Sequence, residues 1–130
     1  MKVFETYIKY NSINKSKERI TGVVSLGFGG FFFPEKEWND FIIILINSWL
    51  NSSYNLVLGI TNYEEFIFMD GPYFLKVSRI DVINCNIECI ENFNQEKVLF
   101  TTRLNINFLH SEIFKNAILL QQFCEKNNWN

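Results

Sequence analysis

Apolar residues recur at helical spacing in the segment that follows Pro34. A proline suits the first turn of a helix, and apolar side chains then return every three or four residues from Trp38 to Trp49. We therefore predict a helix over about 35–50, with Trp38 and Trp49 on one face and Asn51-Ser52-Ser53 at its end. Its first turn would contain three acidic residues, which stabilise a helix N-terminus: Glu35, Glu37 and Asp40.

A second segment near the C-terminus has the same spacing. Ser111 is a suitable N-cap, and apolar residues recur from Ile113 to Cys124. We predict a second main helix over about 111–126. His110 precedes the predicted cap and is expected in a loop or capping role.

Between these helices the pattern is that of strands. Alternation of apolar and polar residues over 83–89 and 97–108 predicts half-buried strands with one wet face. Asp70-Gly71-Pro72 separates the runs 65–69 and 73–79 and predicts a hairpin turn. Further strands are predicted over 2–10, 20–26 and 56–60, an apolar run is noted over 31–33, and a polar loop is predicted over 11–19.

This order of elements predicts the fold class. Strands that follow one another in runs, rather than alternating strictly with helices, indicate an α+β fold, here an antiparallel sheet packed by the two helices. The chain has 130 residues, no internal repeat and no linker rich in Pro or Gly, so we expect one domain, 1–130. With 48% hydrophobic residues, it can bury a core without a disulfide or a metal ion.

The N-terminal segment and the cysteines bear on location. The first residues lack the apolar stretch of a signal peptide, and the longest apolar run, 41–46, is too short to span a membrane. Cys85 and Cys89 lie in an apolar alternation, which suits reduced core cysteines. We therefore expect a cytoplasmic protein with no membrane partner.

The net charge of −2 conceals a strongly acidic middle segment. Residues 35–96 have three basic and ten acidic side chains, net −7, whereas both flanks are positive. Nucleic-acid binding needs a clustered basic surface, so we expect no nucleic-acid partner. An acidic segment suits a basic protein partner, although ordinary solubility explains it equally well.

The chain has few of the residues that catalytic and metal sites need. Gly27-Phe28-Gly29-Gly30 is followed by three Phe rather than by the Lys-Ser/Thr of a phosphate loop, which favours a glycine turn. His110 is the single histidine, and Cys85 and Cys89 lack the C-x-x-C spacing of zinc sites. We therefore assign no catalytic, cofactor-binding or metal-binding residue and expect no enzyme.

Acidic and aromatic residues cluster around the predicted hairpin and the strand after it. Carboxylates there can bind a basic partner, and exposed tyrosines are enriched at protein interfaces. In an antiparallel meander these side chains lie on neighbouring strands or at their ends, so one patch can form. The predicted partner-binding residues are Tyr63, Glu64, Glu65, Asp70, Tyr73, Glu88 and Glu91.

The segment Gly27-Phe28-Gly29-Gly30-Phe31-Phe32-Phe33-Pro34, followed by Trp38-Asn39-Asp40-Phe41 and Trp49, resembles immunity proteins of bacterial polymorphic toxin systems. The resemblance is to those of contact-dependent growth inhibition in particular, and it covers about residues 20–75. It implies a cytoplasmic inhibitor that binds the C-terminal toxin domain of a large exported protein. Many such toxins are nucleases with basic clefts, which an acidic inhibitor would occlude. The family has no shared binding motif, so the resemblance assigns no binding residue.

Two other functions stay open. The sheet of an α+β domain can provide a pocket for a small molecule or for catalysis, and the chain can also be a subunit of a homo-oligomer. A deep apolar pocket that contains His110 or paired carboxylates would favour the first of these. A flat acidic surface would favour the immunity protein.

Overall fold

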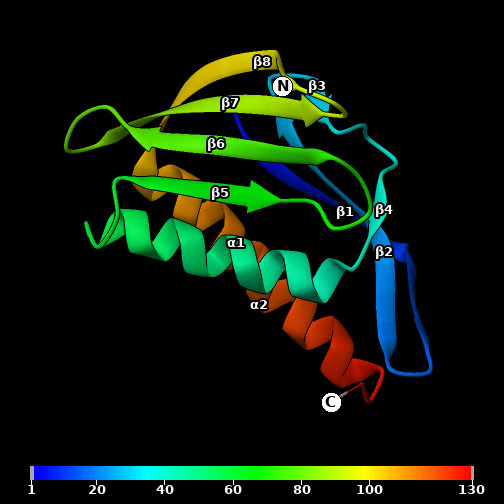
Figure 1. Cartoon of the computed structure of the whole chain (residues 1–130). Helices are drawn as coiled ribbons and strands as arrows, with labels where there is room; N and C mark the ends of the chain where they lie inside the picture. The colour runs from blue at the N-terminus through cyan, green and yellow to red at the C-terminus, as the bar shows by residue number, and fades with distance from the viewer. Residues whose placement is uncertain (1, 130) are drawn as a thin grey trace.

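Two antiparallel sheets and two helices make up the computed structural model, which describes residues 2–129 (Figure 1). The first sheet contains β1 (Glu5–Ser16), β2 (Arg19–Phe28), β3 (Phe31–Phe33) and β4 (Asn39–Asp40). The second sheet is a meander of β5 (Tyr63–Ile67), β6 (Tyr73–Arg79), β7 (Asn84–Asn92) and β8 (Glu96–Asn105). The helices are α1 (Ile42–Val57) and α2 (Ile106–Lys126). The predicted α+β class is therefore confirmed.

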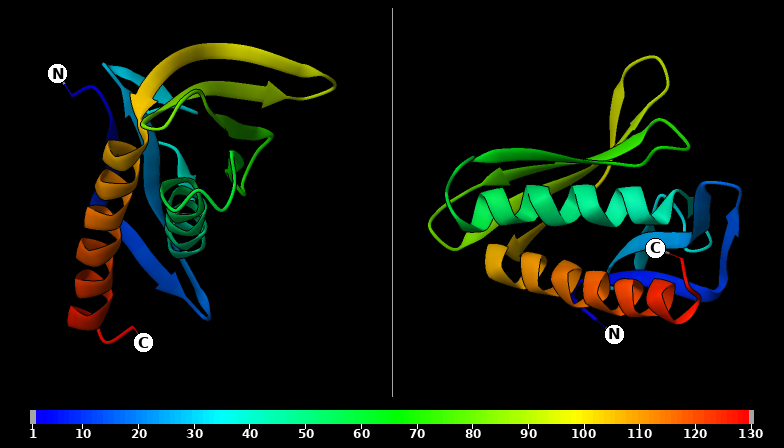
Figure 2. Two further views of the ribbon diagram at one scale, coloured as in Figure 1. Left: turned by 90° about the vertical axis from the view of Figure 1, so that its left-hand side faces the viewer. Right: turned by 90° about the horizontal axis from the view of Figure 1, so that it is seen from below.

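The elements form layers. Figure 1 looks onto the outer face of β5–β8, and no helix or other strand lies in front of it. Behind that sheet lie α1, the first sheet and α2, as the turned views show (Figure 2). Apolar side chains from both sheets and both helices form one buried core, which includes Val24, Phe33, Trp49, Leu75 and Ile113.

Helix α1 begins later than the sequence predicts. After a cis Phe33–Pro34 bond the chain turns, with the Trp38 N–H donating to the Glu35 carbonyl at 3.3 Å. Residues 39–40 then pair with β2 as strand β4. The prediction that the helix starts near residue 35, with Trp38 on its face, is therefore wrong. The first turn of α1 contains no acidic residue.

Helix α1 also ends later than predicted. Asn51-Ser52-Ser53 continues the helix, because the Ser53 hydroxyl donates back to the Leu50 carbonyl at 3.0 Å and its side chain is buried. The helix runs to Val57, so the strand predicted over 56–60 is wrong. Gly59 follows with φ of +71°, a left-handed conformation that glycine adopts without strain.

The polar segment 11–19 is not a loop. It forms the outer part of the β1–β2 hairpin, a two-stranded ribbon whose side chains mostly face solvent. Ile13 is buried there because it packs directly on Gly22, where a Cβ would lie 2.8 Å from the Ile13 side chain. With so little buried surface, the ribbon has no clear apolar alternation for sequence reasoning to detect.

Helix α2 begins at Ile106, five residues before the predicted start. Its N-cap is Asn105, whose side-chain oxygen accepts the Phe108 N–H at 3.0 Å, so the predicted Ser111 cap is wrong. Strand β8 correspondingly ends at Asn105 and does not reach 108. The predicted end near Lys126 is confirmed.

The hairpin and the clearest alternation are confirmed. Strand β6 has the predicted bounds, 73–79, and pairs with β5 across the turn that contains Asp70-Gly71-Pro72. Along β7, Cys85, Ile87 and Cys89 are buried as predicted, but Ile83 lies before the strand and is 51% exposed.

Leu45 tests the packing of α1 on the core. Its side chain is 1% exposed, whereas the neighbouring Ile44 is 53% exposed. Leu45→Ala should lower the free energy of unfolding by about 2–5 kcal/mol, because it leaves a cavity in the core. Ile44→Ala, the matched control, should change it by less than about 0.5 kcal/mol. Denaturant melts of the two variants check this, and equal effects would contradict the packing described.

Candidate functional site

The outer face of the second sheet has a row of charged residues. The strand register places Glu65 of β5 opposite Lys76 of β6, and Lys76 opposite Glu88 of β7. Lys76 also forms an ion pair with Glu96 of β8. The Tyr63 hydroxyl donates to Glu65 at 2.6 Å. We call these five residues the acidic row; it contains three carboxylates and one ammonium group.

The charges of the acidic row affect one another. The hydrogen bond to Glu96, with added attraction from Glu96, Glu88 and Glu65, raises the pKa of Lys76. Burial raises the pKa of Tyr63 most, followed by its hydrogen bond to Glu65. Lys76 therefore neutralises only part of the negative charge, and the row keeps a net charge of −2.

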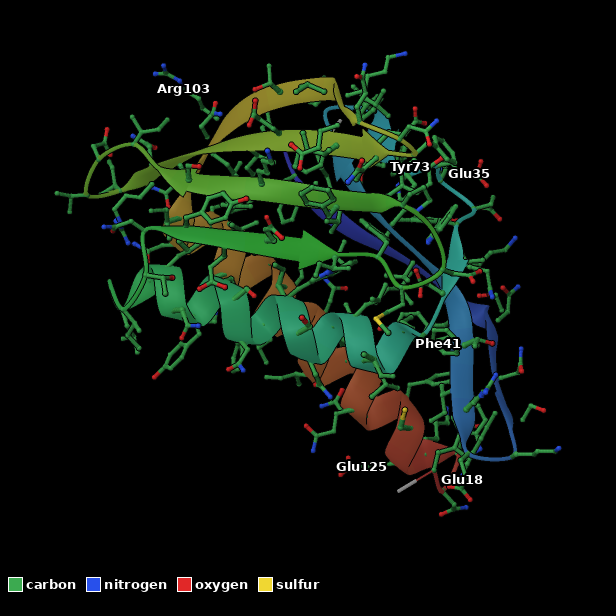
Figure 3. All side chains as sticks on the ribbon, viewed as in Figure 1. Glu18, Glu35, Phe41, Tyr73, Arg103 and Glu125 are labelled. Carbon is green, nitrogen blue, oxygen red and sulfur yellow. The ribbon has the colours of Figure 1, made fainter. Side chains whose placement is uncertain are left out.

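Tyr73 and Glu91 are opposite each other in the register but lie outside the acidic row. The Tyr73 ring packs edge-on against Trp38 and Phe33, with ring centres 5.3 and 5.8 Å away. Burial and then the charge of Glu91 raise the pKa of Tyr73, with a smaller contribution from Glu35. Figure 3 shows Tyr73 and Glu35 together at one end of the molecule. Tyr73, Glu91 and Glu35 therefore form a separate acidic site, whose tyrosine ring packs against Trp38 and Phe33.

The two remaining predicted residues have local structural roles. Glu64 accepts a hydrogen bond from the Thr61 hydroxyl at 2.6 Å and one from the Asn55 amide at 3.4 Å, which ties β5 to the end of α1. Asp70 lies in the β5–β6 turn with an exposed side chain. The seven predicted residues are therefore divided among four places rather than gathered in one patch. Glu96 was missed because the register places it opposite Asn92, and its contact with Lys76 arises only where the two side chains reach across β7.

Asp40 is a second residue that sequence reasoning did not identify correctly. Its carboxylate is 1% exposed and accepts four hydrogen bonds, from Trp38 Nε1 at 2.9 Å and from three backbone N–H groups. Those N–H groups belong to Phe41 at 2.7 Å, Met69 at 3.0 Å and Asp70 at 3.1 Å. Because these donors lie at the start of α1 and in the β5–β6 turn, the Asp40 carboxylate joins the two regions.

His110 and Ser53 form the one contact that resembles part of a catalytic triad. His110 Nδ1 lies 2.9 Å from Ser53 Oγ, between α2 and α1. The Ser53 hydroxyl is fully buried and also contacts the Leu50 carbonyl, so a substrate does not reach it. The His110 ring packs against Tyr54 and Phe114. This geometry ties the two helices together and offers no nucleophile to solvent.

The cysteines are buried free thiols. Burial raises the pKa of Cys85 to about 11 and that of Cys89 to about 12, so neither is a reactive thiolate near neutral pH. Within residues 2–129, no three His, Cys, Asp or Glu side chains are grouped so as to hold a metal ion. Over the same residues, neither helix has the length and apolar character to cross a membrane.

Concave regions lie beside the second sheet rather than on its open face. A hollow of about 680 Å³ lies between the N-terminal segment, the β6–β7 loop and the start of α2. Its lining combines apolar Phe4 and Phe108 with basic Arg103 and Lys115. Lys115 is already paired with the buried Glu112 at 3.0 Å, so only part of this positive charge is free for a ligand.

Comparisons with protein-family models, with curated proteins and with solved structures find no match to this chain. The geometry described above is therefore the basis for any functional conclusion.

The buried Asp40 network can be tested by an isosteric change. Asp40→Asn replaces one of two accepting oxygens by an NH₂ group that faces an N–H donor. It should lower the free energy of unfolding by about 1–3 kcal/mol, because a buried donor loses its partner. Asp70→Asn, an exposed neighbour, should change it by less than about 0.5 kcal/mol. Chemical denaturation measures both, and an unchanged Asp40→Asn variant would contradict the role assigned to the carboxylate.

His110 predicts how stability depends on pH. Burial lowers the pKa of His110 in the folded protein, so the unfolded chain takes up its proton first as the pH falls. This contribution to stability is complete above the ordinary histidine pKa of about 6.5 and is lost as the pH falls below it. His110→Asn should show a flatter stability profile between about pH 7.5 and pH 5.5. Urea melts of the wild-type chain and of His110→Asn across this range measure the two stability profiles. Parallel profiles would rule out His110 as the source of the pH dependence.

Proposed function

We propose that this chain is an immunity protein, which binds and neutralises the toxin domain of a bacterial toxin system. The observation that carries the proposal is the acidic row on the uncovered face of β5–β8. The resemblance of residues 27–41 to immunity proteins points the same way. We further propose that the toxin is a nuclease, that its active site is occluded, and that binding takes place in the cytoplasm.

The physical basis is charge complementarity on a rigid support. A nuclease binds phosphate groups with a basic cleft, and carboxylates can occupy that cleft in their place. Glu65 and Glu88 lie two strands apart, about 10 Å at the usual strand spacing. Backbone hydrogen bonds fix that separation, so little entropy is lost when the acidic row meets its partner.

Exposed apolar side chains near the acidic row can add contact area. Tyr63 is 45% exposed, and Ile67, two residues further along β5, is 49% exposed. A tyrosine held by a hydrogen bond is a suitable anchor at an interface, because it buries a large surface at a small entropy cost. Tyr63, Glu65 and Glu88 are therefore the predicted partner-binding residues that we retain, and we add Lys76 and Glu96.

The alternative function, a small-molecule site, is favoured less by this geometry. The 680 Å³ hollow does not contain His110, and the hollow that His110 lines, between α1 and α2, is only about 230 Å³ in volume, below the roughly 300–1,000 Å³ of ligand pockets. A further hollow of about 710 Å³ is lined by Asp40 and Asp70, but the Asp40 carboxylate already accepts four hydrogen bonds. We therefore propose binding of a protein, without catalysis, as the activity of this chain.

Association kinetics with the toxin domain encoded next to this gene test the proposal. Glu65→Lys/Glu88→Lys should slow association by about tenfold or more and weaken its salt dependence. The control Glu18→Lys/Glu125→Lys makes the same change in net charge at sites far from β5–β8, the sheet that has the acidic row (Figure 3). It should leave the salt dependence nearly unchanged.

Two results would overturn parts of this proposal. Equal effects of the two double variants would mean that only net charge matters and that the acidic row is not the docking site. A toxin domain that does not bind the wild-type chain at all would remove the proposed function itself. Both double variants should retain the wild-type stability within about 1 kcal/mol, because the changed side chains lie at the surface.

A further inference from the structure

A groove between α1 and α2 exposes an unusual amount of apolar surface. Figure 2 (right) looks onto the two helices, which lie side by side with no strand in front of them. Two adjoining hollows of about 440 and 230 Å³ run between them. Three of the side chains that line this helical groove are strongly exposed, Tyr54 at 49%, Phe114 at 48% and Ile118 at 39%.

The helices that form this groove have no net charge. Helix α1 contains no Asp, Glu, Lys or Arg in its 16 residues. Helix α2 contains two acidic and two basic residues in its 21, and its Glu112 is paired with Lys115. The charged residues that line the groove are Lys15 and Glu18, of opposite sign. Depletion of charge together with exposed aromatic residues is typical of the centre of a protein interface, not of a solvated surface.

We propose that the helical groove binds a second copy of this chain and forms a two-fold symmetric dimer. In such a dimer each surface patch faces the same patch of the other copy, so a charged patch repels itself. The acidic row, with three carboxylates and one lysine, is therefore unsuited to self-pairing. So is the outer side of the β1–β2 hairpin tip, where Lys17 and Arg19 are both positive, whereas Lys15 and Glu18 of the same tip border the groove and offset each other. Of these three surfaces, the neutral helical groove alone meets itself without net repulsion.

The helices are long enough for the contact that a stable dimer needs. A stable interface needs about 800 Å² from each partner, which is roughly a tenth of the 7409 Å² surface of this chain. Helices of 16 and 21 residues extend about 24 and about 31 Å at ~1.5 Å per residue. A patch of about 800 Å² is about 30 Å across, so the longer helix spans it and the shorter helix spans most of it.

The dimer does not depend on the function proposed above. The two helices that line the groove face the viewer in Figure 2 (right), whereas the acidic row belongs to β5–β8, whose outer face is seen in Figure 1. Pairing through the helices therefore leaves both acidic rows free.

Sedimentation velocity of the isolated chain tests the proposal, from micromolar to high micromolar concentration. The wild-type chain should sediment at twice the monomer mass of 15.4 kDa. Ile118→Lys places a charge in the helical groove and should weaken dimerisation by at least about tenfold. The matched control Phe93→Lys changes a residue that is 68% exposed in the β7–β8 hairpin, and it should remain dimeric.

Ionic strength provides an independent measurement. A neutral, apolar interface should change little between low salt and about 0.5 M salt, whereas an interface held by charges should weaken. A monomeric wild-type chain at high micromolar concentration overturns the proposal. So does a dimer that Ile118→Lys leaves intact, or one that dissociates in salt. Circular dichroism confirms that each variant is folded, so that loss of the dimer is not confused with unfolding.

Discussion

The buried carboxylate of Asp40 is the contact on which the rest of the structure depends. Asp40 is the last residue of strand β4, just before helix α1, and its carboxylate accepts hydrogen bonds from N–H groups on both sides of that junction and from the β5–β6 turn. A buried charge is stable only when donors surround it, and four do so here. Since these donors belong to different elements, satisfying one side chain fixes the first sheet, the start of α1 and the second sheet relative to one another.

The residues on which we base the proposed resemblance to immunity proteins lie at and around this junction. Phe33, Trp38 and Trp49 all belong to the resembling segment, and their rings converge on Phe68 at centre distances of 5.6, 6.4 and 5.1 Å. The Trp38 ring also covers Gly71, where a Cβ would lie 2.8 Å from it. These residues therefore build the interior and hold the hairpin turn. The acidic row lies elsewhere, on the outer face of β5–β8.

The sequence predicted an element correctly where neighbouring residues alone determine its structure. The turn at Asp70-Gly71-Pro72 and the alternation from Cys85 to Cys89 are local signals, and both were confirmed, although Ile83 is exposed. The start of α1 was wrong because the tertiary contacts of Asp40 overrode the signal of Pro34. The candidate site depended on strand register, which no local pattern encodes. Side-chain direction matters as well, since Glu64 turns toward α1, and Glu96, which the register places opposite Asn92, reaches Lys76.

The three surfaces of the molecule differ in charge, and this difference has consequences that the net charge of −2 hides. The sheet face is acidic, the hairpin tip is basic and the helical face is neutral. Coulomb attraction reaches over roughly 8–10 Å at physiological salt, so a charged face acts before contact and governs the association rate. A neutral apolar face acts only on contact and governs how long a complex lasts. One small chain can therefore select a charged partner and pair with its own copy without either surface competing with the other.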